Sequence, residues 1–151
     1  MAVKTYLYNT NLRLSNNFVV SEFRCKCGKA HSTLISTELV KGLQQLVGVL
    51  GASKAIITSG YRCPAHDIAV GGNGAGQHTK GTAADVIFYD KQGKAISSKI
   101  VSCKAQDLGF SGIANIDSSS RPTRACELKY NLDLIFHTIQ MSRPTRACEL
   151  K

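Results

Sequence analysis

The middle of the chain constrains the fold most, because it combines a helical pattern, two short apolar runs and a long loop. Apolar residues at helical spacing predict a helix over 36–50. The runs 55–58 and 84–89 are short and apolar, as expected of buried strands. Between them, 59–77 contains five glycines and one proline, which predicts a long irregular loop. A loop of this length in a compact domain is usually functional.

The flanking regions add further elements of both kinds. We expect a short helical turn at 21–23, a second helix over 96–108 and a third strand over 110–116. The segment 130–141 is apolar apart from a few polar side chains and could form a fourth strand. Mixed helices and strands in this order predict an α+β domain, with a small, mostly antiparallel sheet flanked by helices.

A perfect duplication marks the C-terminal part of the chain. The decapeptide Ser-Arg-Pro-Thr-Arg-Ala-Cys-Glu-Leu-Lys occupies 120–129 and recurs unchanged at 142–151. Two copies cannot form a solenoid, so the repeat indicates a recent duplication or translated cloning-linker sequence. We therefore predict a single domain over 1–117 and keep 118–151 out of the fold argument, although the last strand could still lie there.

Composition limits the possible functions. The 151 residues are 43% hydrophobic and 19% charged, as in globular proteins. No apolar run is long enough to span a membrane, and the first residues show no secretory signal. The net charge of +9 favours an anionic partner, but no run of basic residues or aromatic-interleaved stripe supports nucleic-acid binding. We expect a monomer.

Cysteines are unusually frequent for a chain that shows no secretory signal. Their even number suggests disulfides, but a reducing compartment favours free thiols, which we expect. Cys25 and Cys27 are too close in sequence to bridge each other easily. Together with His31 they form a Cys-x-Cys-x3-His group, which does not match a standard structural zinc site.

The densest polar group follows the glycine-rich loop. His78 lies at the end of this loop and Asp85 at the start of the second predicted strand. A neutral imidazole and a carboxylate are both good zinc ligands, and across a turn they can converge on one ion. Two potential ligands can equally be a loop histidine and a strand-capping aspartate, so spacing alone leaves both interpretations open.

Several ordered motifs over roughly 14–116 resemble the zinc D-Ala-D-Ala carboxypeptidase superfamily, which includes vancomycin-resistance dipeptidases and phage endolysins. They are Ser-Gly-Tyr-Arg at 59–62, Val-Gly-Gly at 70–72 and Gly-Gln-His-Thr-Lys-Gly-Thr-Ala-Ala-Asp at 76–85. The last differs from the family pattern in having Gly76 at its first position. The lead-in around 14–23 and the segment 108–113 are similar to the small phage-type branch. The resemblance implies a hedgehog-like α+β fold.

The resemblance also implies roles for individual residues. His78 and Asp85 would bind Zn²⁺, and Arg62 would hold a substrate carboxylate or the developing oxyanion. Gln77 is assigned to substrate binding. Arg62 could instead make only a salt bridge. His66 has the wrong position for a family ligand, and we interpret it as part of the loop structure.

The resemblance fails at the third ligand. Family members of this branch carry a late His-x-Asp motif, but His137 is the only late histidine here, and Ile139 stands where the carboxylate is expected. We predict His137 as the third zinc ligand and Asp133 as the general base, on a strand over 130–141 paired beside 84–89. If the natural strand is missing, the site has only two protein ligands.

The combined interpretation is a zinc metallopeptidase that hydrolyses peptidoglycan stem peptides. It would act as a D,D-carboxypeptidase or as an endolysin-type endopeptidase, from a phage or a bacterial cytoplasm, reaching the wall after release. Two alternatives stay open: a degenerate module that binds wall peptides without cutting them, and a phage structural protein on the same fold.

Overall fold

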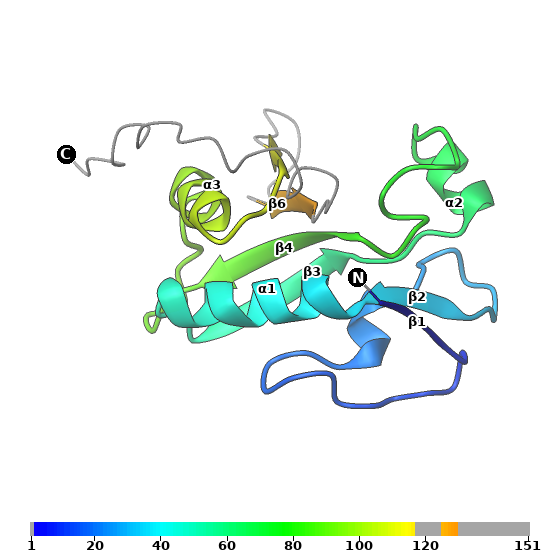
Figure 1. Ribbon diagram of the computed structural model, residues 1–151, viewed down its shortest axis with the longest axis horizontal. Coiled ribbons are helices and arrows are strands. Elements are labelled where there is room, and N and C mark those ends of the chain that lie inside the picture. The colour runs from blue at the N-terminus through cyan, green and yellow to red at the C-terminus, as the bar shows by residue number, and fades with distance from the viewer. Residues whose placement is uncertain (1, 117–124, 130–151) are drawn as a thin grey trace.

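The computed structural model describes residues 2–116 and 125–129 of the chain (Figure 1). In chain order, the elements are β1 (Val3–Tyr6), the 3-10 helix η1 (Val20–Phe23), β2 (Thr33–Ser36), α1 (Thr37–Val49), β3 (Lys54–Ser59), α2 (Pro64–Ala69), β4 (Ala83–Tyr89), α3 (Ser98–Asp107), β5 (Gly112–Ile116) and β6 (Ala125–Lys129). This arrangement confirms the predicted α+β class. None of the helices in these residues is long and apolar enough to cross a membrane.

Two antiparallel sheets organise the described residues. The larger has the strand order β3-β4-β6-β5, and the smaller pairs β1 with β2. The predicted helices at 36–50 and 96–108 correspond to α1 and α3, and the predicted strands at 55–58, 84–89 and 110–116 correspond to β3, β4 and β5. The helical turn at 21–23 is η1.

Three features differ from the prediction. The β1–β2 sheet was not foreseen, because β1 is short, mostly exposed and pairs with a distant segment. The loop 59–77 is not irregular throughout, since it contains α2, whose first residue is Pro64. Proline is well tolerated at the first helical position, where no backbone donor is needed. β6 falls inside the first decapeptide copy, whereas the prediction placed the possible last strand of the tail at 130–141.

The core lies between α1, α3, η1 and the larger sheet. Ser36 caps α1 by accepting a hydrogen bond from the Leu39 backbone. Leu39, Leu43 and Leu46 then bury the same face of the helix. They join one cluster with residues from η1, β4 and α3, including Val20, Phe23, Val86, Phe88, Val101 and Ala105. This core fixes β4, which is buried along almost its whole length.

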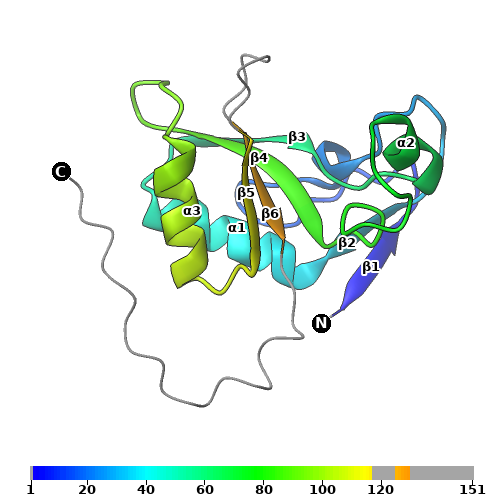
Figure 2. The same cartoon turned by 90° about the horizontal axis from the view of Figure 1, so that it is seen from above.

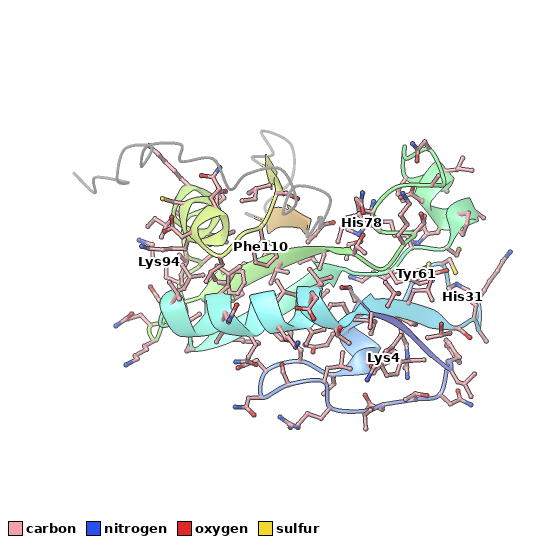
Figure 3. The ribbon with its side chains drawn as sticks, in the orientation of Figure 1. Lys4, His31, Tyr61, His78, Lys94 and Phe110 are labelled. Atoms are coloured by element: carbon pink, nitrogen blue, oxygen red, sulfur yellow. The ribbon has the colours of Figure 1, made fainter. Side chains whose placement is uncertain are left out.

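The candidate residues gather at one end of the molecule. α2 and the β1–β2 sheet lie at this end and α3 at the other, in both views (Figures 1 and 2). His78, Tyr61 and His31 lie on the same side (Figure 3).

The expectation of free thiols is confirmed for Cys25, Cys27 and Cys63 and is wrong for Cys103, which is disulfide-bonded.

Candidate functional site

His78 is held by the backbone of the β3–α2 connection. Its Nδ1 lies 2.7 Å from the carbonyl oxygen of Gly60, and the side chain is only 5% exposed. Because a carbonyl can only accept, Nδ1 carries the proton and Nε2 presents a lone pair when the imidazole is neutral. The backbone N–H of Arg62 donates to the His78 carbonyl at 3.3 Å. These two bonds fix the imidazole against the segment that carries Arg62.

A close backbone approach explains the glycine of the Ser-Gly-Tyr-Arg motif. A Cβ on Gly60 would lie 2.6 Å from the Cα of Phe23, which is too close for real atoms. The next N–H, from Tyr61, donates to the Phe23 carbonyl at 2.8 Å. Only glycine lets this strand end pass η1 closely and still present its carbonyl to His78.

Asp85 is a buried carboxylate on the central strand β4. A bulge in β3 between Ile57 and Ser59 places Ser59 opposite Asp85. Oδ1 of Asp85 lies 3.5 Å from Nε2 of His78, and Oδ2 lies 3.0 Å from a terminal nitrogen of Arg62. The two oxygens therefore face different partners, and Oδ1 receives no hydrogen bond from the described residues.

Arg62 bridges two buried carboxylates. One terminal nitrogen pairs with Asp85 at 3.0 Å and the other with Asp67 at 3.4 Å, while Nε donates to Oγ of Ser59 at 2.9 Å. Asp67 is held in turn by the backbone N–H of Gly74 at 3.0 Å. The guanidinium is oriented by three partners, and the Arg62 side chain remains 22% exposed. This arrangement is more than the isolated surface salt bridge considered from sequence.

The His78–Asp85 pair fits a zinc ion. Two ligand atoms on one tetrahedral zinc, each at about 2.0–2.1 Å from the metal, lie about 3.3 Å apart. The observed separation of Nε2 and Oδ1 is 3.5 Å. Both atoms can offer lone pairs, which makes a cation between them favourable. The separation of the two atoms and their lone pairs therefore both permit metal binding here.

Gln77 stabilises the turn between the two candidate ligands. Its side-chain carbonyl accepts a hydrogen bond from Oγ1 of Thr82 at 2.5 Å, and its backbone carbonyl accepts one from the Thr82 N–H at 3.0 Å. The side chain is half-buried. Its assignment to substrate binding stays a prediction, and its observed contacts hold the turn.

The comparison with protein families decides the classification. The sequence pattern of the family described as peptidase M15 matches residues 16–118. The chain belongs to the peptidase M15 family. This match spans the η1, α1, β3, α2, β4 and α3 elements and includes Arg62, His78 and Asp85. No curated protein matches the chain significantly.

The last part of the expected M15 site falls where the structure gives no description. His137 and Asp133 both lie outside the described residues. Among the described residues, β6 pairs with β4 from Ala83 to Val86. In this register Glu127 stands opposite Asp85. The predicted strand over 130–141 lies outside the described residues.

Sequence reasoning missed two residues that contact Arg62 in this group, Asp67 and Ser59. Asp67 is 4% exposed, and it looked like one more polar residue in a loop. Ser59 belonged to the quoted motif but had no assigned role. The signal that could have found Asp67 was the Cys-Pro start of a helix at 63–64, which places an acidic residue in the first turn.

A group of thiols adjoins the segment that carries Arg62. Hydrogen bonds from the Lys29 backbone and from His31 lower the pKa of the Cys27 thiol to about 6. Burial raises the pKa of the Cys25 thiol to about 11. The contact with Cys27 raises the pKa of His31. The Cys25 and Cys27 thiols, which lie near Arg62, therefore have very different pKa values.

A cavity of about 540 Å³ lies elsewhere, between β1, β2, α1 and the segment 12–15. Lys4, Arg13 and Lys41 are among its lining residues. None of the residues that line it is a candidate ligand, so the candidate site remains the His78–Asp85–Arg62 group and not this cavity.

Replacing Arg62 with lysine should lower peptidase activity about 10- to 100-fold while zinc content stays unchanged. A lysine can reach one carboxylate but cannot bond both carboxylates and Ser59 together, and a charged hydrogen bond contributes about 1.5–3 kcal/mol. Steady-state kinetics with parallel metal analysis measures both effects. Arg13→Lys is the matched control, because the Arg13 guanidinium donates to the Asn16 carbonyl and not to Asp85 or Asp67. Full activity in Arg62→Lys would reduce this side chain to a generic positive charge.

Proposed function

We propose that the chain is a zinc-dependent peptidase that hydrolyses bonds in the stem peptides of bacterial peptidoglycan. The observation that carries the proposal is the buried pair of His78 Nε2 and Asp85 Oδ1, separated by 3.5 Å, in a chain of the M15 family. The bond cleaved is either the terminal D-Ala-D-Ala bond or a bond within the stem or cross-bridge.

His78 and Asp85 are the proposed protein ligands in the described residues. His137 is proposed as the third and Asp133 as the general base. Zinc bound here would lower the pKa of a water molecule and polarise the scissile carbonyl. Asp133 would accept a proton from the attacking water and return it to the leaving amine.

Arg62 is proposed to bind substrate through its exposed edge. Its contacts with Asp67 and Ser59 orient the guanidinium before substrate arrives, so little side-chain freedom is lost on binding. A planar guanidinium suits a peptide carboxylate or the oxygen that gains charge during attack. Gln77 is proposed to donate hydrogen bonds to the peptide from its side-chain NH₂, because its side-chain oxygen already accepts one from Thr82.

The charge of the chain supports a wall substrate. The net charge of +9 favours approach to an anionic polymer, and the effect falls as salt screens it. We propose that the protein acts as a monomer of phage or bacterial origin, after release to the wall.

One observation favours a second candidate function, a wall-binding module that does not cut. β6 pairs with β4 beside Asp85, whereas the sequence predicted that a strand over 130–141 would lie next to β4 and supply the third ligand. If no other segment supplies that ligand, two protein ligands would hold zinc weakly, and the Arg62 group could still hold a peptide carboxylate.

Product analysis tests the proposed activity. The full chain with zinc is incubated with a purified pentapeptide stem and with cross-linked muropeptides, and products are identified by mass spectrometry. Release of the terminal D-alanine indicates a carboxypeptidase, and an internal cut indicates an endopeptidase. Binding of either substrate without any product would replace the peptidase by the wall-binding module.

Replacing His137 with alanine should weaken zinc binding at the peptidase site by several orders of magnitude. A catalytic zinc site normally uses three protein ligands, and removal of one of them leaves the site incomplete. A competitive chelator titration measures the affinity, with the wild-type chain as reference. An unchanged affinity would show that His137 does not complete the site.

A further inference from the structure

A second group of potential metal ligands lies beside the peptidase site. Ligand atoms of Cys25, Cys27, His31 and Cys63 all lie within 4.8 Å of one another. Three of the four come from the loop that follows η1, and Cys63 comes from the residue before α2. Sequence reasoning considered only the first three, because Cys63 is distant in the chain.

The imidazole of His31 is oriented toward this group. Its Nδ1 lies 3.2 Å from the carbonyl oxygen of Ser32, so Nδ1 carries the proton. Its Nε2 then faces Sγ of Cys27 at 3.0 Å. Metal-ligating histidines commonly donate their second ring N–H to a backbone carbonyl in this way, which fixes the tautomer.

The thiols are available and close enough to share one ion. Cys25, Cys27 and Cys63 are free cysteines. Sulfur ligands on one tetrahedral zinc lie about 3.8 Å apart, given Zn–S distances of about 2.3 Å. Small side-chain rotations would bring the group from its present separations to this geometry.

We propose that Cys25, Cys27, His31 and Cys63 bind a structural zinc ion, separate from the metal of the peptidase site. Three thiolates and one imidazole complete a tetrahedral shell and leave no open position for water, as in structural rather than catalytic zinc sites. Sulfur-rich ligand sets select zinc over calcium and magnesium.

The ion would connect two segments that are distant in the sequence and already contact each other through hydrogen bonds of Cys25 and Lys26. Residues 24–32 form neither helix nor strand before β2, and they are tied to the rest by contacts such as that of the Cys63 N–H with Cys25 Sγ at 3.3 Å. Cys63 directly follows Arg62. The structural zinc would therefore fix the backbone from which Arg62 reaches Asp85 and Asp67.

His66 is the nearest group outside the set. Its Nδ1 lies 3.1 Å from Sγ of Cys25, but it is not within reach of all the other ligand atoms. We therefore do not include His66 among the zinc ligands and interpret it as a hydrogen-bond partner of the Cys25 sulfur. This assignment makes His66→Ala the matched control for His31→Ala.

Cobalt substitution of the full chain, purified under reducing conditions, tests the proposal. Three thiolates bound to Co²⁺ give a strong sulfur-to-metal charge-transfer band, whereas a site of nitrogen and oxygen ligands gives none. We expect the band to saturate at about one cobalt per chain, and bound zinc to slow modification of the three thiols by a disulfide reagent about tenfold or more. Neither readout depends on the His78–Asp85 site.

The variants locate the ion. His31→Ala and Cys63→Ser should each weaken cobalt binding about tenfold or more, so that more cobalt is needed to saturate the band, and His66→Ala should keep the wild-type affinity. The thiol-protection assay on the wild-type chain covers the case in which a variant fails to fold. Absence of the band in reduced wild-type protein, equal thiol reactivity with and without zinc, or weaker cobalt binding in His66→Ala but not in His31→Ala would each overturn the assignment.

Discussion

Replacing Asp85 with asparagine should remove the peptidase zinc and lower turnover of a stem peptide about a thousandfold or more. The amide keeps the size of the side chain but offers a neutral oxygen to the metal, and its NH₂ group cannot replace the charge that pairs with Arg62. A thousandfold is the factor that several kcal/mol of lost transition-state stabilisation produces. Stopped assays of peptide hydrolysis, with zinc affinity measured in parallel, give both values. His78→Ala should behave alike.

The matched control is Asp107→Asn. Asp107 lies on α3, is 65% exposed and makes a long ion pair with Lys104 at 3.8 Å. This variant should keep wild-type turnover and wild-type zinc. Retention of the peptidase zinc with unchanged affinity in Asp85→Asn or His78→Ala would show that the two side chains are not the ligands.

Replacing Gly81 with alanine should destabilise the fold by about 2–5 kcal/mol. Gly81 has a φ of +70°, and a Cβ there would lie 2.4 Å from the backbone oxygen of Leu34. The left-handed backbone costs about 1–2 kcal/mol for other residues, and forced overpacking adds about 1–3 kcal/mol. Urea unfolding measures the change, and the melting temperature should fall by roughly 5–15 °C. The turn that contains Gly81 packs on β2 and links His78 to Asp85.

Gly51→Ala separates the two causes. Gly51 has a φ of +59°, but no atom lies within 4 Å of the position that an added Cβ would take, so this variant carries the backbone penalty alone. We expect its loss of stability to stay near 1–2 kcal/mol. Equal destabilisation in the two variants would mean that the contact between Gly81 and β2 does not matter.

The central elements could be predicted because their patterns are local. The helix α1 shows apolar residues at helical spacing, and β3 and β4 are short apolar runs bounded by turn residues. β1 could not be predicted in this way, since three of its four residues are exposed and its partner β2 lies far along the chain. The helix α2 was hidden by the glycines around it.

The candidate site shows the same division. The resemblance placed His78, Asp85 and Arg62 in one group, and the structure brings these three side chains together. The Cys-Pro start of α2 could have placed Asp67 in the first turn of a helix, but its pairing with Arg62 depends on how α2 turns back toward that side chain. The complete group of cysteines and His31 was not predicted for a related reason. Cys63 comes close to the loop that follows η1 only because β3 and η1 pack together, as the hydrogen bond from the Tyr61 N–H to the Phe23 carbonyl shows.

The two metal groups affect how zinc is counted. A chain that holds zinc through its cysteines alone would still contain about one ion, so zinc content by itself does not test the His78–Asp85 site. The difference in zinc content between wild type and Asp85→Asn does test it, because the cysteine group is unchanged in that variant.

The most direct measurement is hydrolysis of a purified stem peptide by the wild-type chain before zinc is stripped, after it is stripped and after it is returned. The proposed ligands predict turnover in the first state, none in the second and recovery in the third. His78→Ala, carried through the same three states, should show no turnover in any of them. Turnover by the zinc-free wild-type chain, or equal turnover by His78→Ala, would contradict the claim that His78 and Asp85 hold the metal on which peptide hydrolysis depends.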